Sequence, residues 1–396
     1  MKAPPLSPAA LLLFFGVATL PVYVFESGSA QPTHMALAAF AAIVLAQYGL
    51  QFSGWVAVLL ALAVHGTFVE AAYTLGGADP EGMMNAAFLW FNLIVPYAIY
   101  QFVVREGESM IARGLIIACV IAVATVLVSG VQLQGEVVEG RSTGSFNNPN
   151  QLGYFAVCLL SLTYLLYTRK QLGNLMALAL FAASTFLSVA SLSKAAIVAN
   201  IAVIFFVVRP ILTKRSTVRW LALMGVGIAG VLYALASGML DQYFFLQRLT
   251  GMFDEGDSSL ESRGYLVFLE GDVLQTLLGL GQENVLDLLR HEVHSTFFAV
   301  LSNYGLVGLI LFLWAMGIWA VAVYREHGLI GLLCITGPSM AYGITHNGTR
   351  FTIFWILFAV SLANPAIQAS LRRRMPAESS PPPIRTFSRP RPNRAG

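Results

Sequence analysis

Apolar runs of membrane-spanning length recur along most of the chain, separated by short polar breaks. An α-helix needs about 20 mainly apolar residues to cross the hydrocarbon core of a bilayer. The pattern predicts twelve such helices, at 9–25, 35–50, 52–70, 85–104, 114–131, 151–168, 173–191, 194–212, 220–238, 295–324, 328–345 and 350–368. We therefore expect an all-α polytopic membrane bundle that forms one domain over residues 1–374.

The composition agrees with this pattern. Hydrophobic residues make up 57% of the chain, charged residues only 11%, and the mean hydropathy is +0.71. Soluble proteins carry about 25% charged residues, so the chain belongs with polytopic membrane proteins. The net charge of +3 comes without an external basic stripe, which argues against nucleic acid as a partner. The cysteines Cys119, Cys158 and Cys334 lie inside apolar runs, so we interpret them as small core residues.

The two ends of the chain need separate interpretation. The N-terminus resembles a secretory signal peptide, because Lys2 precedes the first apolar run and the small residues 27–30 follow it. Cleavage there would invert the orientation of the remaining spans. The charge distribution favours an uncleaved first helix instead. Residues 375–396 are rich in Pro, Arg and Ser, a composition that predicts a disordered cytoplasmic tail.

The basic residues orient the bundle. Cytoplasmic loops of membrane proteins carry an excess of Lys and Arg, and this rule places both termini inside. Of the 23 Lys and Arg residues, six then remain at the outer face: Arg141, Lys194, Arg248, Arg263, Arg290 and Arg350. Most of the basic residues lie at the cytoplasmic face, so the few at the outer face need an explanation. We interpret them as residues that surround an anion. A long, partly helical outer loop over about 239–294 is where we expect the chemistry.

The first motif with chemical content runs from Arg141 to Phe155. Asn148 followed by Pro149 is typical of an N-cap with proline in the first turn of the sixth span. The N–H groups at such a helix start point outward and favour phosphate. Arg141, Asn147 and Asn150 are therefore candidate substrate-binding residues. The alternative is an ordinary capped helix with a solvent-facing arginine.

Two further cations occupy turns of the outer face. Lys194 follows Ser193 between the seventh and eighth spans, where a charge marks either a ligand or a side chain that snorkels to the interface. Arg263 precedes an amphipathic stretch that ends in the glycine-rich turn 277–282. The planar guanidinium of arginine suits phosphate better than an ammonium does. A surface pair of Arg263 with Glu261 is the alternative.

The segment Arg290-His291-Glu292-Val293-His294-Ser295 precedes the tenth span directly. If it is helical, Arg290 and His294 lie one turn apart on the same face. A neighbouring cation favours neutral imidazole, the form that a general base needs before the reaction. Binding of a metal by His291 and His294 would lack the HExxH pattern, so we expect neither metal nor cofactor.

The last outer loop, 345–350, supplies another histidine and arginine, His346 and Arg350. Its Asn347-Gly-Thr matches a glycosylation sequon, which we interpret as chance in so short a loop. His34 and His65 have no cationic neighbours, and we expect them to be structural.

Together these motifs resemble the superfamily of O-antigen ligases and polysaccharide polymerases. The resemblance covers about 141–350 and rests on Arg-x-x-Gly-x-Phe-x-Asn-Pro-Asn before a span, a basic turn after Ser193, and His-Ser-x-x-Phe…Asn-Tyr-Gly-Leu-Val-Gly-Leu after the long loop. Lys194 departs from the arginine common at that turn. The resemblance implies a GT-C-like helical membrane bundle in the bacterial inner membrane, with its active site facing the periplasm.

The resemblance also implies a reaction and roles for residues. The reaction is metal-independent, inverting glycosyl transfer from an undecaprenyl-pyrophosphate-linked glycan to a hydroxyl group. His294 matches the histidine of the catalytic motif, where it would act as the base, and Arg263 would assist it. Arg141, Lys194 and Arg350 match basic positions that line the site. The outer-face motifs themselves add Asn147, Asn150, Arg290 and His346 as candidates to bind the pyrophosphate or the glycan.

Three functions stay open at this point. A polymerase would extend one glycan-lipid with another, and a ligase would transfer the glycan to lipid A–core. The motif Asn148-Pro149-Asn150 favours the polymerase. A transporter or flippase is the alternative of another class, but it would be expected to show internal repeats or charges in mid-membrane, and the polar residues here gather at one face.

Overall fold

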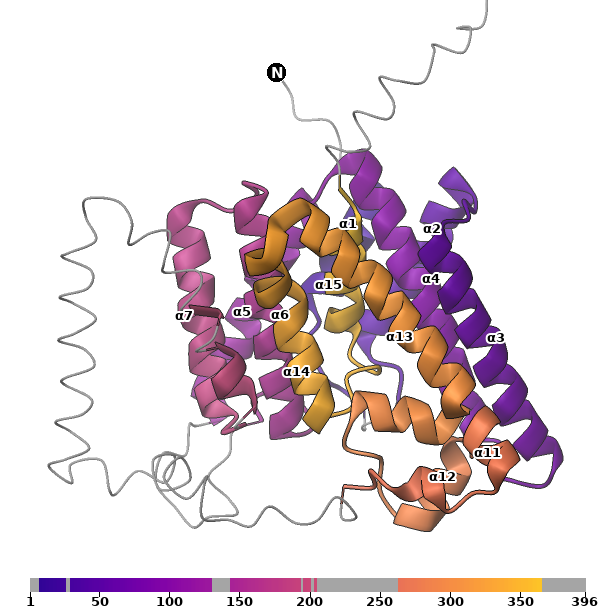
Figure 1. Cartoon of the computed structure of the whole chain (residues 1–396). Helices are drawn as coiled ribbons and strands as arrows, with labels where there is room; N and C mark the ends of the chain where they lie inside the picture. Colours follow the sequence, from indigo (N-terminus) through magenta and orange to yellow (C-terminus); the bar gives the residue numbers. More distant parts are fainter. Residues whose placement is uncertain are drawn as a thin grey trace, which may run out of the picture.

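The computed structural model describes residues 7–25, 29–129, 143–193, 195–200, 203–204 and 263–364. Its elements are α1 (Pro8–Ala18), α2 (Pro32–Tyr48), α3 (Gly54–Leu75), α4 (Gly82–Glu106), α5 (Ser109–Ser129), α6 (Pro149–Thr168), α7 (Asn174–Ala190), the 3-10 turn η1 (Val267–Leu269), α11 (Val273–Leu278), α12 (Gln282–Leu289), α13 (Thr296–Gly331), the π-helical turn η2 (Leu332–Thr336), α14 (Gly337–Thr345) and α15 (Thr352–Leu362). All regular structure in these ranges is helical, so the predicted all-α class is confirmed there (Figure 1).

Five helical stretches among the described residues are long and apolar enough to cross a membrane. They are α3, α4, α5 as far as Val128, α6, and the continuous stretch Thr296–Thr345. The helices α1, α2, α7 and α15 are apolar but shorter. A helical membrane protein is therefore the class that the structure supports, and the predicted number of twelve spans is not confirmed. Several predicted segments lie largely or wholly outside the described residues. They are the spans 194–212 and 220–238, the part of the long loop from 239 to 262, and the tail 375–396.

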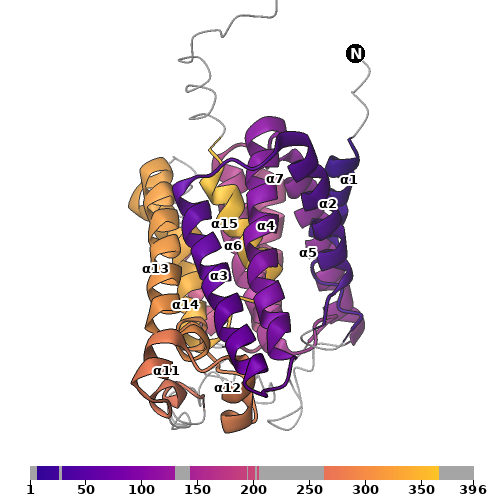
Figure 2. The same ribbon diagram turned by 90° about the vertical axis from the view of Figure 1, so that its right-hand side faces the viewer.

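Successive helices run in opposite directions, so their connections gather at two ends of the bundle (Figures 1 and 2). We call the end at which α11 and α12 lie the α12 end. The opposite end, which carries the turn at residues 169–173 between α6 and α7, is the Arg169 end.

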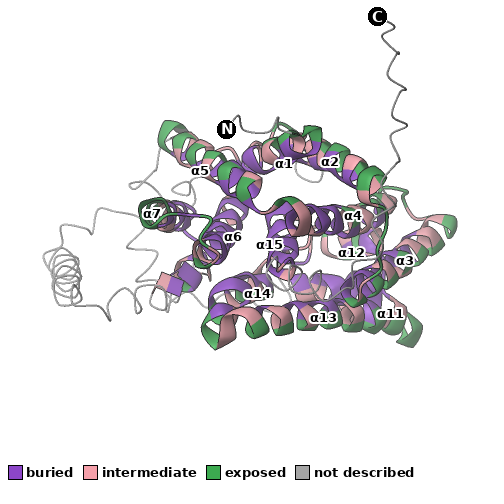
Figure 3. Cartoon of the chain, turned by 90° about the horizontal axis from the view of Figure 1, so that it is seen from above, coloured by how far each residue is buried: buried purple, intermediate pink, exposed green. Residues whose placement is uncertain are grey.

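The helix α15 lies at the centre of the bundle, against α4, α6 and α13 (Figure 3). It has 11 residues, and all of those from Thr352 to Ser361 are buried. An α-helix of this length spans about 16 Å, well short of its neighbours. The loop that precedes α15 therefore enters the α12 end of the bundle, where it forms part of a cavity.

The helix α13 turns a corner at Gly305, where the backbone has φ 65° and ψ −169°. The short leg before this corner lies across the α12 end, and the long leg runs toward the Arg169 end (Figure 1). A Cβ at Gly305 would lie 2.3 Å from the carbonyl oxygen of Leu277, so only glycine fits this contact with α11. The single span predicted over 295–324 thus consists of two legs. A second break at Gly328 separates it from the stretch predicted as 328–345.

A buried ionic cluster closes the Arg169 end. The guanidinium of Arg169 donates to Glu108 and, at 2.7 and 2.8 Å, to both carboxylate oxygens of Glu326. It also donates to the carbonyl oxygens of Val360 and Ala363, each at 2.8 Å, at the end of α15. The side chains of Arg169 and Glu108 are only 9% and 1% exposed. The cluster therefore ties α6, α13, α15 and the turn between α4 and α5 together.

Candidate functional site

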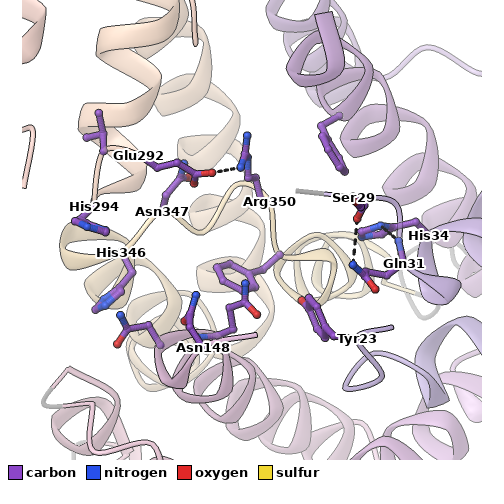
Figure 4. A pocket seen from close by; sticks show the side chains of 15 residues that line it. Tyr23, Ser29, Gln31, His34, Asn148, Glu292, His294, His346, Asn347 and Arg350 are labelled. Atoms are coloured by element: carbon purple, nitrogen blue, oxygen red, sulfur yellow. Dashed lines mark hydrogen bonds and ion pairs between the residues drawn. The ribbon is translucent and has the colours of Figure 1, made fainter. Parts of the chain in front are cut away.

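A cavity of about 280 Å³ opens at the α12 end of the bundle. Five separate parts of the chain surround it: the connection between α1 and α2 with the start of α2, Phe88 of α4, the start of α6, the segment 290–295, and the loop between α14 and α15 (Figure 4). Its polar lining comprises Tyr23, Ser29, Gln31, His34, Asn148, Asn150, Gln151, Glu292, His294, His346, Asn347 and Arg350. The structure thus brings four of the predicted site residues, Asn150, His294, His346 and Arg350, to one cavity.

The segment 290–295 is not helical, so the condition under which Arg290 and His294 would share a helical face is not met. The helix α12 ends at Leu289 because Arg290 takes the left-handed conformation, with φ 61° and ψ 9°. The side chain of Arg290 is 84% exposed and lies 3.7 Å from Asp287 on α12. It does not line the cavity, so the expected pairing of Arg290 with His294 on one helical face is absent. Because the backbone here is not helical, His294 lines the cavity while Arg290 does not.

His294 is held in place through the backbone on both sides. Its own N–H donates to the carbonyl oxygen of Arg263 at 3.1 Å, and Ser295 caps α13 immediately after it. The hydroxyl of Tyr265 donates to the carbonyl oxygens of Ile344 at 3.0 Å and of His294 at 3.4 Å. These hydrogen bonds fix residues 263–265 to the start of α13 and to the end of α14.

The imidazole of His294 is favoured in its neutral form. Partial burial lowers its pKa below the ordinary value of 6.5, and the nearby His291 and Arg263 lower the pKa further. The carboxylate of Glu292 acts in the opposite direction without reversing the shift. The rings of His291 and His294 stack with their centroids 5.3 Å apart. Neutral imidazole beside a cavity is able to accept a proton from a bound hydroxyl group.

Among the residues that the structure describes, Arg350 is the arginine that borders the cavity. Its guanidinium donates to the carboxylate of Glu292 and, at 2.7 Å, to the side-chain oxygen of Asn85 on α4. The side chains of Arg350 and Glu292 are 26% and 41% exposed, so the ion pair remains in contact with solvent (Figure 4). A bound anion is able to compete with Glu292 for this guanidinium.

The second histidine of the cavity, His346, lies at the end of α14. Its ring stacks on the ring of Tyr342 with centroids 4.6 Å apart, and its Nδ1 lies 3.0 Å from the hydroxyl of Thr345. The carbonyl oxygen of His346 accepts hydrogen bonds from the N–H and the hydroxyl of Thr296, at 3.2 and 3.0 Å. His346 and His294 are thus joined through the first residues of α13.

The start of α6 has the cap that the sequence predicts. The side chain of Asn148 accepts a hydrogen bond from the N–H of Gln151 at 2.9 Å, and Pro149 occupies the first turn. Asn150 lines the cavity, so the positive end of the α6 dipole faces it. The side chain of Asn147 donates to the carbonyl oxygen of Phe25 at 3.3 Å instead. Asn147 therefore joins α6 to the connection between α1 and α2.

Three further predicted residues remain, two of them outside the described part of the chain. Arg141 and Lys194 lie outside the described residues. Arg263 is half-buried and does not line the cavity, yet its charge acts on His294. Among the residues that the structure describes, no group of three His, Cys, Asp or Glu side chains is placed to hold a metal ion.

The wall formed by the connection between α1 and α2 was not predicted. Gln31 is 2% exposed and folds this connection by donating to Phe25 and accepting from Val24 and Phe25. His34 accepts from the N–H of Gln31 at 2.9 Å and bonds Thr352 at 2.9 Å, so its predicted structural role is consistent with these contacts. Gln31-Pro32 repeats the pattern of Asn148-Pro149, and this repeat is the signal that would have pointed to the wall.

No protein-family model and no curated protein matches this chain.

Proposed function

We propose that the protein is a glycosyltransferase that acts at the periplasmic face of the inner membrane and uses an undecaprenyl-pyrophosphate-linked glycan as donor. The observation that carries the proposal is the meeting of His294, Arg350, His346 and the start of α6 at one cavity. In this proposal the α12 end faces the periplasm of a bacterium, and the bundle lies in the inner membrane. No metal is required.

The anion-binding part of the cavity suits a pyrophosphate at a membrane surface. A polyprenyl tail keeps its pyrophosphate at the lipid–water boundary, the level at which the connections of a helical bundle lie. Arg350 and the first turn of α6 supply positive potential there. Arg141 and Lys194 remain candidates to complete this site. The cavity of about 280 Å³ is near the lower end of ligand sites, so it fits the reacting groups and not a long glycan.

The reaction is a direct displacement at the anomeric carbon. The hydroxyl oxygen of the acceptor forms a bond to this carbon while the bond from the carbon to the phosphate oxygen breaks. The imidazole of His294 accepts the hydroxyl proton, and undecaprenyl pyrophosphate leaves with the electron pair. Negative charge develops on the departing phosphate, where Arg350 would stabilise it. A single preorganised donor of this kind contributes about 10²–10³ in rate.

Attack from the face opposite the leaving group inverts the configuration of the anomeric carbon. His294 and Arg350 reach the cavity from different segments, the stretch 290–295 and the loop before α15 (Figure 4). In this proposal the base and the anion-binding group act at the two ends of an in-line displacement. The single-displacement mechanism needs no covalent enzyme intermediate.

The acceptor distinguishes a polymerase from a ligase, and we propose the polymerase of O-antigen or exopolysaccharide repeat units. The test uses purified full-length protein in detergent, an undecaprenyl-pyrophosphate oligosaccharide and EDTA. The same glycan-lipid and lipid A–core are offered as acceptors in separate reactions. A ladder of longer lipid-linked glycans is the expected result. Glycan on lipid A–core would identify a ligase instead.

Transfer to neither acceptor would contradict the proposed function. Movement of intact glycan-lipid between the leaflets of proteoliposomes would then favour the transporter or flippase. Product that appears only after a divalent metal is added would contradict the metal-independent mechanism.

A further inference from the structure

The short helix α11 carries an apolar face that no described part of the chain covers. Val273, Leu274 and Leu277 on this face are 79%, 62% and 42% exposed, and Leu269 in the preceding turn η1 is 62% exposed. The polar residues of the helix are engaged at its start, where Gln275 forms a capping box with Asp272. The exposed surface of η1 and α11 is therefore almost entirely aliphatic.

The opposite side of α11 is fixed to the corner of α13. The N–H of Leu280 donates to the carbonyl oxygen of Ser302 at 2.8 Å, and the hydroxyl of Tyr73 donates to that of Gly279 at 3.0 Å. A Cβ at Gly279 would lie 2.2 Å from the carbonyl oxygen of Asn303. The backbone at the end of α11 is therefore packed directly against α13, and the apolar face lies on the side away from this contact.

The apolar face continues onto the long leg of α13. Leu306, Val307 and Ile310 begin one residue beyond the corner, and they are 39%, 38% and 61% exposed. In a helical membrane bundle, exposed aliphatic side chains of a spanning helix face lipid. The helix α11 is attached where this lipid-facing surface meets the α12 end (Figures 1 and 3).

We infer that η1 and α11 lie in the boundary between headgroups and acyl chains of the bilayer, with Leu269, Val273, Leu274 and Leu277 in contact with lipid. Helices that expose one apolar face bind this boundary in proportion to the apolar area that they bury. No Lys or Arg occurs between residues 264 and 289, and the charged residues nearest the apolar face, Glu270 and Asp272 between η1 and α11, are acidic. The attachment is therefore hydrophobic and does not require anionic lipid.

This placement fixes the level of the membrane relative to the cavity. The boundary at which α11 lies is at the same end of the bundle as His294 and Arg350. The inference rests on the bundle being in a membrane and not on the proposed glycosyl transfer. A failed transfer assay would therefore leave it standing.

The depth of α11 is measurable with a single nitroxide label. The native Cys119, Cys158 and Cys334 are all buried, so a cysteine introduced by Leu274→Cys is the preferred site of labelling. The labelled full-length protein is reconstituted into phosphatidylcholine vesicles. Collision of the nitroxide with oxygen, which concentrates in lipid, is compared with collision with a water-soluble nickel chelate.

Two matched positions calibrate the result. Ile310→Cys places the label on the lipid-facing side of α13, and Asp287→Cys places it on α12, where the native side chain is 70% exposed. We expect the ratio of oxygen to nickel collisions at position 274 to approach that at 310 and to exceed that at 287 several-fold. Addition of phosphatidylglycerol is expected to leave the ratio unchanged.

Three results would overturn the inference. A ratio at position 274 equal to that at 287 would place α11 in water. Low collision with both reagents would mean that another part of the protein covers the apolar face. A ratio that rises only when phosphatidylglycerol is present would show that the attachment is electrostatic.

Discussion

Arg169 and Arg350 each lie at one end of the bundle, but they differ in how far their guanidinium groups are accessible to a ligand. Arg169 is 9% exposed and bonds two carboxylates and the carbonyl groups that end α15. Arg350 is 26% exposed, bonds one carboxylate and one amide, and borders a cavity. The first guanidinium has its hydrogen bonds within the protein, and the second faces a space where a ligand is able to replace its partner.

The comparison separates an arginine that holds the fold from one that we propose to bind the substrate. Buried charges have to be paired because an unpaired charge in a low-dielectric interior is costly. A partly exposed pair such as Arg350 with Glu292 contributes little to stability, so we expect Arg350 to matter more for the proposed binding of an anion than for folding. The following changes test this difference, beginning with the largest expected effect.

Removal of Arg169 is expected to destabilise the protein most. Arg169→Met leaves the carboxylate of Glu108, which is 1% exposed, without its cation. Breaking a buried ion pair in this way costs about 3–5 kcal/mol. Thermal unfolding in detergent measures the loss. The double variant Arg169→Met/Glu108→Gln is expected to regain part of it, and unfolding of the single variant at the wild-type temperature would contradict the structural role.

Removal of Arg350 is expected to act on transfer and not on folding. Arg350→Gln should lower the transfer rate by about 10²–10³ because a donor to the leaving phosphate is lost. Its effect on the free energy of unfolding should stay within about 1 kcal/mol, the value of a hydrogen bond such as that to Asn85. Rates and unfolding temperatures are measured on the same preparation. A variant that transfers glycan at the wild-type rate would remove Arg350 from the proposed site.

The pH dependence of transfer is expected to report His294. Its pKa is lowered below 6.5, so the neutral base persists at pH 6.5 and is lost only as the pH falls further. The acid limb of kcat/KM should therefore lie below pH 6.5. His291→Gln should move the limb to higher pH and Glu292→Gln to lower pH, since the first group lowers the pKa and the second raises it. Shifts of the opposite sign would show that another group is the base.

Arg290 provides the smallest expected effect. Its side chain is 84% exposed and does not line the cavity, so Arg290→Ala should leave both transfer and stability close to wild type. This variant is the matched control for Arg350→Gln because each removes one arginine at the α12 end. A large loss of transfer would show that Arg290 reaches the substrate by a route that the structure does not reveal.

The sequence predicted those features that depend only on residues close together in the chain. The all-α class, the Asn148 cap on α6 and the break between α2 and α3 follow from apolar runs, cap residues and Gly49. The corner at Gly305 was not predicted because a glycine within an apolar run is compatible with a straight helix. Its requirement for glycine comes from α11, almost thirty residues earlier in the chain.

The site was predicted in part for the same reason. Motif spacing identified His294, His346 and Arg350, but the periodicity argument failed for Arg290, where a left-handed residue ends α12. Glu292 and Gln31 were missed because they become part of the site only when distant segments meet. Arg169 was counted simply as a cytoplasmic charge, and only the packing of α13 and α15 around it shows that it is buried.

The most direct test of the proposed base is the transfer assay with His294→Ala, with Arg290→Ala as the matched control from the same segment. We expect His294→Ala to elute and unfold like the wild type but to form no ladder of lipid-linked glycans, while Arg290→Ala forms the ladder at a normal rate. A normal ladder from folded His294→Ala would contradict the assignment of the cavity as the site of transfer.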